Sequence, residues 1–184
     1  MANEIYADIA RRTNGDIYVG VVGPVRSGKS TFIKRFMEQL GIPNIQSEAR
    51  RERAVDELPQ SAGGKTIMTT EPKFIPEEAV ELTLGESAKM RVRMIDCVGY
   101  IVPSALGYIE NDQPRMVHTP WFEQEVPFNM AAEVGTRKGI AEHSTIGLVV
   151  TTDGSITDLP RAEYAECVGG EQDAFCRIIA EHHL

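Results

Sequence analysis

Eight residues near the N-terminus combine glycines, a lysine and a hydroxyl at a fixed spacing. Residues 23–30 read GPVRSGKS and match the pattern G-x-x-x-x-G-K-S/T at every fixed position. Glycines in such a loop let successive backbone N–H groups point inward at phosphate oxygens. Lys29 would reach the β- and γ-phosphates of a nucleotide, and the Ser30 hydroxyl would ligate Mg²⁺. The spacing therefore predicts a loop that binds a nucleoside triphosphate.

The chain on either side of this loop has the context that the pattern needs. Residues 17–22 form a continuous apolar run, typical of a strand buried on both faces. Residues 30–40 carry one apolar stripe at helical spacing, and the positive end of that helix dipole would face the phosphates. The residues expected to contact the nucleotide in and beside the loop are Gly23, Arg26, Ser27, Gly28, Lys29, Ser30 and Thr31.

A second acidic motif, Asp-x-x-Gly, ends an apolar strand at Asp96 and Gly99. An aspartate at the end of a strand beside a phosphate loop can hold Mg²⁺ through water. Gly99 would let its backbone N–H approach the γ-phosphate. Asp-x-x-Gly alone fits many turns, so the prediction depends on the phosphate loop that precedes it.

The segment between these motifs, residues 60–70, is small and polar, and we expect a mobile loop. Thr69 and Thr70 are candidate sensors of the γ-phosphate, and Thr70 is also a candidate Mg²⁺ ligand. The alternative is that these threonines only open a β-strand, where β-branched residues are common. We therefore expect the catalytic set to be Lys29, Asp96, Thr69 and Thr70.

The residue after Asp-x-x-Gly is Tyr100, where many small GTPases carry a glutamine that orients water. A tyrosine cannot polarise water in that way. We expect hydrolysis to be slow, to depend on another group, or to need a group from a neighbouring subunit.

The remaining periodicity predicts an α/β domain over residues 1–184. The expected helices are residues 3–12, 47–58, 129–143 and 171–182, and the expected later strands are 73–84, 89–95 and 145–151. Strands 73–84 and 89–95 would form an antiparallel hairpin, while residues 145–151 would be an exposed apolar edge and weaken the chain. The prediction is a P-loop NTPase fold, with a mostly parallel sheet, helices on both faces and a GTPase-like strand order.

Residues 99–128 contain four prolines and cannot form one long helix. We expect a long irregular segment that Trp121 pins to the body of the domain, since tryptophan is usually largely buried. An exposed partner contact at Trp121 is the alternative.

Composition narrows the class of protein. The chain has 42% hydrophobic and 25% charged residues, which is typical of a packed globular domain. With 19 basic and 27 acidic residues its net charge is −8, which argues against nucleic acid as a partner. Three scattered cysteines give no disulfide framework, and no apolar run is long enough for a membrane span. We expect a cytoplasmic protein.

Several longer stretches resemble stage IV sporulation protein A, the family of spore-coat morphogenetic ATPases in the GTPase-like P-loop branch related to translation factors. The similar stretches are residues 15–38, 56–76, 93–100, 118–128 and 131–155, within a resemblance that covers about residues 3–165. The resemblance implies Mg²⁺-dependent ATP hydrolysis that drives self-assembly into a polymer on the forespore surface, from the mother-cell side. It also implies a small amphipathic partner at the membrane surface and coat proteins as partners.

The resemblance weakens after about residue 165, and the middle and C-terminal regions of the family are not in this sequence. We therefore expect a C-terminally incomplete domain. The residues present do not read the base, so GTP is not excluded, and a regulatory GTPase switch that does not polymerise is the main alternative. A small-molecule kinase is disfavoured because no arginine-rich lid segment is evident, and a nucleotide-binding remnant without turnover stays open.

Overall fold

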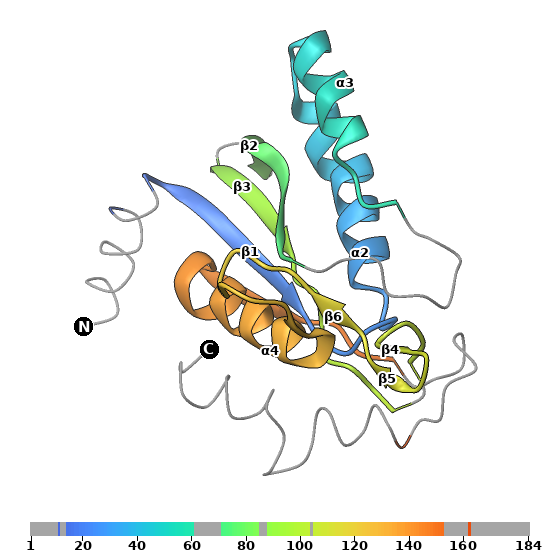
Figure 1. The fold of residues 1–184 in the computed structure, drawn as a ribbon. Coiled ribbons are helices and arrows are strands. Elements are labelled where there is room, and N and C mark those ends of the chain that lie inside the picture. Colours follow the sequence, from blue (N-terminus) through green and yellow to red (C-terminus); the bar gives the residue numbers. More distant parts are fainter. Residues whose placement is uncertain are drawn as a thin grey trace.

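A mostly parallel four-stranded sheet lies at the centre of the computed structural model, which describes residues 11, 14–60, 71–84, 88–103, 105–152 and 162 (Figure 1). In the order β2-β3-β1-β8, its strands are β2 (Lys73–Leu84), β3 (Ala88–Asp96), β1 (Asp16–Val22) and β8 (Ile146–Val149). β1 runs parallel to β3 and β8, whereas β2 is antiparallel to β3. The predicted strands and the antiparallel hairpin are therefore confirmed, whereas β8 is half-exposed and not buried on both faces.

Helices cover both faces of this sheet (Figure 1). One face carries α2 (Lys29–Phe36), the π-helical turn η1 (Met37–Gly41), the 3-10 turn η2 (Ile42–Asn44) and α3 (Glu48–Asp56). The other face carries α4 (Phe128–Lys138) and the π-helical turn η3 (Gly139–His143). The predicted helices 30–40 and 129–143 thus each change from α- to π-helical geometry before they end.

Neighbouring residues of β1 point to the two faces in turn and define two cores. Val21 packs with Ile33 and Met37 beneath α2, in a cluster that also holds Met94. Val22 packs instead with Ile95 and Ile140 beneath η3. This alternation is the period-two pattern of a strand, and it explains why both valines are buried.

The proline-rich segment 99–128 is more regular than the sequence indicates. Two small antiparallel pairs lie within it, β4 (Ile109–Glu110) with β5 (Gln113–Pro114) and β6 (Met116–Val117) with β7 (Val126–Pro127). The segment is anchored by Val98, Val102 and Phe128, which pack with Ala131 of α4 in a third core cluster. The prediction of a wholly irregular segment is therefore wrong, because short pairings and apolar anchors stabilise it.

Other parts of the chain bear on the remaining predictions. The predicted helices 3–12 and 171–182 and the loop 60–70 lie largely or wholly outside the described residues. β8 is the last strand of the described sheet on its side, and Ile146 and Val149 are 51% and 40% exposed. Within the described part of the chain, none of the helices has the length and hydropathy to cross a membrane.

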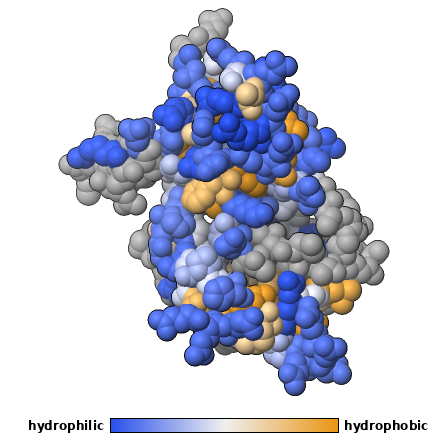
Figure 2. Space-filling view, turned by 45° about the horizontal axis from the view of Figure 1, so that its top comes forward, coloured by the Kyte–Doolittle hydropathy of each residue, from blue (hydrophilic) through white to orange (hydrophobic). Residues whose placement is uncertain are grey.

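Most of the surface seen in Figure 2 is hydrophilic, with smaller apolar areas between the charged ones. The hydrophilic area in the upper part of Figure 2 lies at the end of the molecule where α3 packs, and α3 carries exposed charged residues along most of its length. Smaller apolar areas break the surface lower down. The phosphate-binding motifs lie where the carboxyl ends of β1 and β3 meet, and Asp56 at the end of α3 lines the same pocket as Ser30 and Asp96.

Candidate phosphate-binding site

The predicted loop follows β1 directly and turns into α2, as the pattern requires. Gly23 has a φ of +141° and Gly28 a φ of +98°, values that favour glycine. A side chain at Gly23 would collide with the backbone oxygen of Val150, which follows β8. Gly28 is the N-cap of α2, so the loop delivers the helix N-terminus to the site.

Lys29 is buried and pairs with its own loop. Its ammonium donates hydrogen bonds to the backbone oxygens of Pro24, at 2.7 Å, and Gly23, at 3.2 Å. Burial lowers the pKa of Lys29 to about 8, against the opposing charge of Asp96. An ammonium has three donors, so one N–H stays available for a phosphate oxygen beyond these two bonds.

Ser30 and Asp96 meet across the site. The Ser30 hydroxyl donates a 2.8 Å hydrogen bond to Asp96 Oδ2. Asp96 is 6% exposed, and burial raises the pKa of its carboxyl, while Ser30, Lys29 and Lys73 oppose that shift. The second carboxylate oxygen, Oδ1, is buried without a hydrogen-bond partner among the described residues. A buried oxygen of this kind calls for a cation or a water.

This donor set fits Mg²⁺. A carboxylate and a hydroxyl are hard oxygen ligands, and Mg²⁺ usually takes one or two protein ligands and completes its shell with water and phosphate. No cluster of three or more His, Cys, Asp or Glu side chains occurs among the described residues, which disfavours a dedicated protein cage there. Ser30 and Asp96 are the residues that would hold the ion.

The Asp-x-x-Gly motif is joined to the loop through the backbone. Tyr100 N–H donates to Gly23 O at 3.2 Å, and Val25 N–H donates to Tyr100 O at 2.7 Å. Gly99 has a φ of +93°, and a side chain there would meet the Lys29 ammonium and Gly23 O. The two motifs therefore form one compact unit, as their order in the sequence predicts.

The other predicted site residues differ in how buried they are and in whether the structure describes them. Ser27 is buried, and its hydroxyl has no hydrogen-bond partner among the described residues, so it is suited to a phosphate oxygen. Arg26 adopts a φ of +62° in the loop turn. Thr31, directly after Ser30 in the first turn of α2, has an exposed side chain. Thr69 and Thr70 lie outside the described residues, so their predicted roles stay predictions.

Tyr100 is buried rather than aimed at an attacking water. It is 8% exposed and belongs to the core cluster with Val22, Ile95 and Ile140. Cys97, in the same cluster, is a free thiol whose pKa burial raises to about 12. A thiol of that pKa is a poor nucleophile at neutral pH, so Cys97 acts as a buried packing residue.

Sequence reasoning missed two residues that contact or border the site. Lys73 is paired with Asp96 in the β2–β3 register, so both side chains project from the same face of the sheet. Thr136 of α4 accepts a hydrogen bond from Gly99 N–H at 3.3 Å. A threonine buried in the middle of an amphipathic helix is the one sequence signal that could have indicated Thr136.

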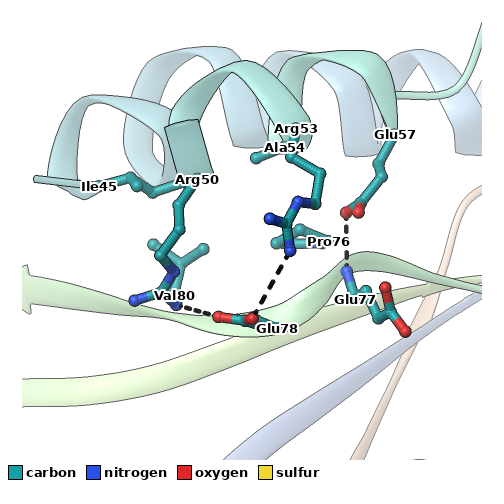
Figure 3. A pocket seen from close by; sticks show the side chains of 9 residues that line it. All are labelled: Ile45, Arg50, Arg53, Ala54, Glu57, Pro76, Glu77, Glu78 and Val80. Atoms are coloured by element: carbon teal, nitrogen blue, oxygen red, sulfur yellow. Dashed lines mark hydrogen bonds and ion pairs between the residues drawn. The ribbon is translucent and has the colours of Figure 1, made fainter. Parts of the chain in front are cut away.

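A second pocket lies between α3 and β2 (Figure 3), and it shares Glu57 and Glu77 with the pocket that Ser30 and Asp96 line. Arg50 and Glu78 form its shortest ion pair, at 2.7 Å, and Arg53 reaches the same carboxylate at 3.9 Å. Glu57 at the end of α3 accepts a 2.8 Å hydrogen bond from the backbone N–H of Glu77. These contacts hold α3 against β2.

The fold is mixed α/β with a mostly parallel central sheet, and together with the loop it is compatible with the P-loop NTPase class. The sequence model of the family described as "Stage IV sporulation protein A, ATPase domain" matches residues 1–174, and the chain belongs to this family. No solved structure matches the chain.

Three curated relatives carry the name stage IV sporulation protein A. Those of Bacillus anthracis and Bacillus subtilis (strain 168) are 61% and 60% identical over 163 residues, which is 89% of this chain and 33% of each relative. That of Clostridioides difficile (strain 630) is 57% identical over 166 residues, 90% of this chain and 34% of the relative. The chain thus spans about a third of the length of these relatives.

Proposed function

We propose that this domain binds ATP with Mg²⁺ and hydrolyses it, and that this cycle drives self-assembly of the spore-coat base layer. The observation that carries the proposal is the contact between Ser30 and Asp96, 2.8 Å long, beside the buried ammonium of Lys29. The family is described as an ATPase domain, and this description supports ATP over GTP.

Different residues of the chain would neutralise phosphate charge, hold Mg²⁺ and contact the γ-phosphate. Lys29 and the backbone N–H groups of the loop neutralise phosphate charge in a site where burial strengthens each electrostatic contact. Ser30 would hold Mg²⁺ directly, and Asp96 would hold it through water. When bound, Mg²⁺ supplies Lewis-acid stabilisation of charge on the phosphate oxygens. Thr69 or Thr70 would report the γ-phosphate, and Gly99 would donate its N–H to it.

The GTPase-like order is part of the proposal. The order β2-β3-β1-β8, with only β2 antiparallel, supports a switch-type arrangement in which loop 60–70 and the Asp-x-x-Gly segment flank the phosphates. Because Tyr100 is buried in the core, the group that orients the attacking water must come from elsewhere. We expect slow turnover by the isolated chain and faster turnover when copies assemble.

Partners and location are proposed from the family alone. We expect the polymer to lie on the forespore surface in the mother-cell cytoplasm, with a small amphipathic membrane-surface protein and coat proteins as partners. The relatives are about three times as long as this chain, and we assign most of these contacts to their further regions.

One experiment tests the proposal directly. Phosphate release is measured from ATP and from GTP, with and without Mg²⁺, and the products are then sedimented. We expect Mg²⁺-dependent release from ATP that exceeds release from GTP, together with sedimenting polymer. Equal release from both nucleotides without sedimentation would instead favour the regulatory GTPase switch.

A further inference from the structure

One side of α4 is built from small residues that other segments approach closely. A side chain added at Gly135 would lie 2.9 Å from the Trp121 ring and 3.4 Å from Pro72. One added at Gly139, in the following turn, would lie 2.9 Å from Cys97 Sγ. Glycine in a helix interior costs about 1 kcal/mol relative to alanine. The close approach of these segments is a physical reason for keeping glycine here.

The segments that meet on this side of the helix contain or adjoin the motifs of the proposed site. Pro72 follows the candidate sensor threonines, Cys97 lies within the Asp-x-x-Gly motif, and Trp121 lies in the segment 99–128. Thr136, between the two glycines, is fully buried, and its hydroxyl oxygen accepts the hydrogen bond from Gly99 N–H. Thr136 is therefore in direct contact with the phosphate-binding unit.

We infer that Thr136 is a positioning residue that competes with the γ-phosphate for Gly99 N–H. We further infer that loss of the Gly99–Thr136 hydrogen bond shifts α4 and changes the packing of Trp121 against it. This inference rests on the proposed function, in which Gly99 donates to the γ-phosphate. A single N–H makes one strong hydrogen bond, so the two acceptors exclude each other. A charged phosphate oxygen accepts about twice as strongly as a neutral hydroxyl. A triphosphate therefore draws Gly99 away from Thr136, whereas a diphosphate leaves the contact in place.

The loss of this contact has a direct route to Trp121. Once Gly99 moves, the Thr136 hydroxyl is buried with its main-chain donor gone, and it must find another partner or shift with its helix. Gly135 is the next residue in the helix and is the one against which the Trp121 ring packs. Trp121 is also the single tryptophan of the chain, so its fluorescence reports this contact without interference.

The test uses the whole 184-residue chain with two variants of the same position. Thr136→Ser keeps the acceptor hydroxyl, and Thr136→Val removes it with little change in shape. The probes are ADP and a non-hydrolysable ATP analogue, each with Mg²⁺. Calorimetry gives both affinities, and tryptophan emission is recorded in the same samples.

The inference predicts that the analogue, but not ADP, changes Trp121 emission in the unaltered chain and in Thr136→Ser. In Thr136→Val the competitor is gone, so the affinity for the analogue relative to ADP should rise about fivefold, the factor associated with one neutral hydrogen bond. Emission of this variant should no longer distinguish the two nucleotides.

The outcomes separate this inference from the function on which it rests. If the analogue binds the unaltered chain but leaves emission as ADP does, or if Thr136→Val keeps the original affinity ratio, the inference is overturned and nucleotide binding stands. If the analogue does not bind the unaltered chain, both are overturned. Should Thr136→Val fail to fold, the emission of the unaltered chain and of Thr136→Ser decides the question.

Discussion

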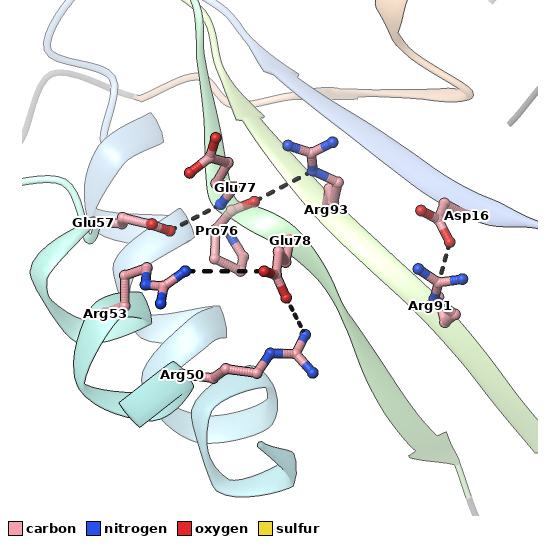
Figure 4. Close-up of polar contacts among 9 residues, drawn as sticks. All are labelled: Asp16, Arg50, Arg53, Glu57, Pro76, Glu77, Glu78, Arg91 and Arg93. Atoms are coloured by element: carbon pink, nitrogen blue, oxygen red, sulfur yellow. Dashed lines mark hydrogen bonds and ion pairs between the residues drawn. The ribbon is translucent and has the colours of Figure 1, made fainter. Parts of the chain in front are cut away.

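The phosphate-binding unit and the contact between α3 and β2 use the same kinds of charged side chain in opposite surroundings. Lys29 and Asp96 are only 5% and 6% exposed. Lys29 contacts backbone oxygens, Asp96 contacts the Ser30 hydroxyl, and the two opposite charges attract each other. Arg50 and Glu78 form a direct ion pair at 2.7 Å, as short as the contact of Lys29 with Pro24, yet their side chains are 50% and 59% exposed (Figure 4). Contact distance alone therefore does not rank these interactions.

Burial explains the difference. In water a close ion pair is worth little, because both charges are already well solvated and two long side chains must be ordered. In the interior the same charges lose their hydration, so each needs a hydrogen-bond or ion-pair partner. Because the surroundings screen little, each charge also acts strongly on a bound phosphate. The lowered pKa of Lys29 reflects the cost of burying its charge. The charged residues between α3 and β2 stay solvated and do not bear this cost.

The largest effect is expected from removing the buried ammonium. Lys29→Met should lower phosphate release from ATP by at least about 100-fold, because a preorganised charge at the phosphates is lost. Its free energy of unfolding should change by less than about 1 kcal/mol, because relief of the buried charge offsets the lost hydrogen bonds. Phosphate release and urea unfolding measure the two effects. Lys34→Met, in the same helix, is the control, and equal loss of turnover in both variants would contradict the assignment.

The metal-binding carboxylate should come next. Asp96→Asn keeps the shape and the hydrogen bond from Ser30 but removes the negative charge that would favour Mg²⁺. We expect the Mg²⁺ concentration for half-maximal phosphate release to rise about tenfold or more, as for loss of an outer-shell metal partner. Titration of Mg²⁺ at saturating ATP measures it. An unchanged midpoint would remove Asp96 from the metal site.

A smaller effect, on stability, compares two glycines of the same site. Gly99→Ala should cost about 2 kcal/mol of unfolding free energy, because the new methyl group collides with Lys29 and Gly23 in addition to the strain at positive φ. Gly28→Ala has a similar φ but open space around it, so it should cost only about 1 kcal/mol. Urea unfolding of the two variants tests the difference. Equal costs would mean that the collision relaxes freely.

The sequence predicted the parts of this comparison that depend on local spacing. The loop 23–30 and Asp96 each follow an apolar strand directly, and parallel strands place their carboxyl ends at one edge, so the meeting of Ser30 with Asp96 was foreseeable. The register that brings Lys73 opposite Asp96 was not, because nothing in an exposed strand start fixes pairing to the residue.

Contacts that depend on packing between distant segments could not be read from the sequence. Gly99 and Thr136 are 37 residues apart, and their hydrogen bond depends on how segment 99–128 folds back before α4 begins. The sequence predicts an irregular segment there, because four prolines and two-residue strands give no periodicity to detect. Arg50 and Glu78 were likewise visible only as charges on a helix and a strand.

The smallest effect should come from the exposed pair. Glu78→Gln removes the charge that meets both Arg50 and Arg53, and we expect a loss of at most about 1 kcal/mol of unfolding free energy. The loss should shrink further at 1 M salt, because surface charges are screened there over a few ångströms. The matched control is Glu81→Gln, on the same strand as Glu78, which removes the exposed ion pair with Lys89 of β3. If Glu78→Gln costs several kcal/mol while the control costs nothing, the α3–β2 contact carries more than a surface pair can, and burial is not what separates the two regions.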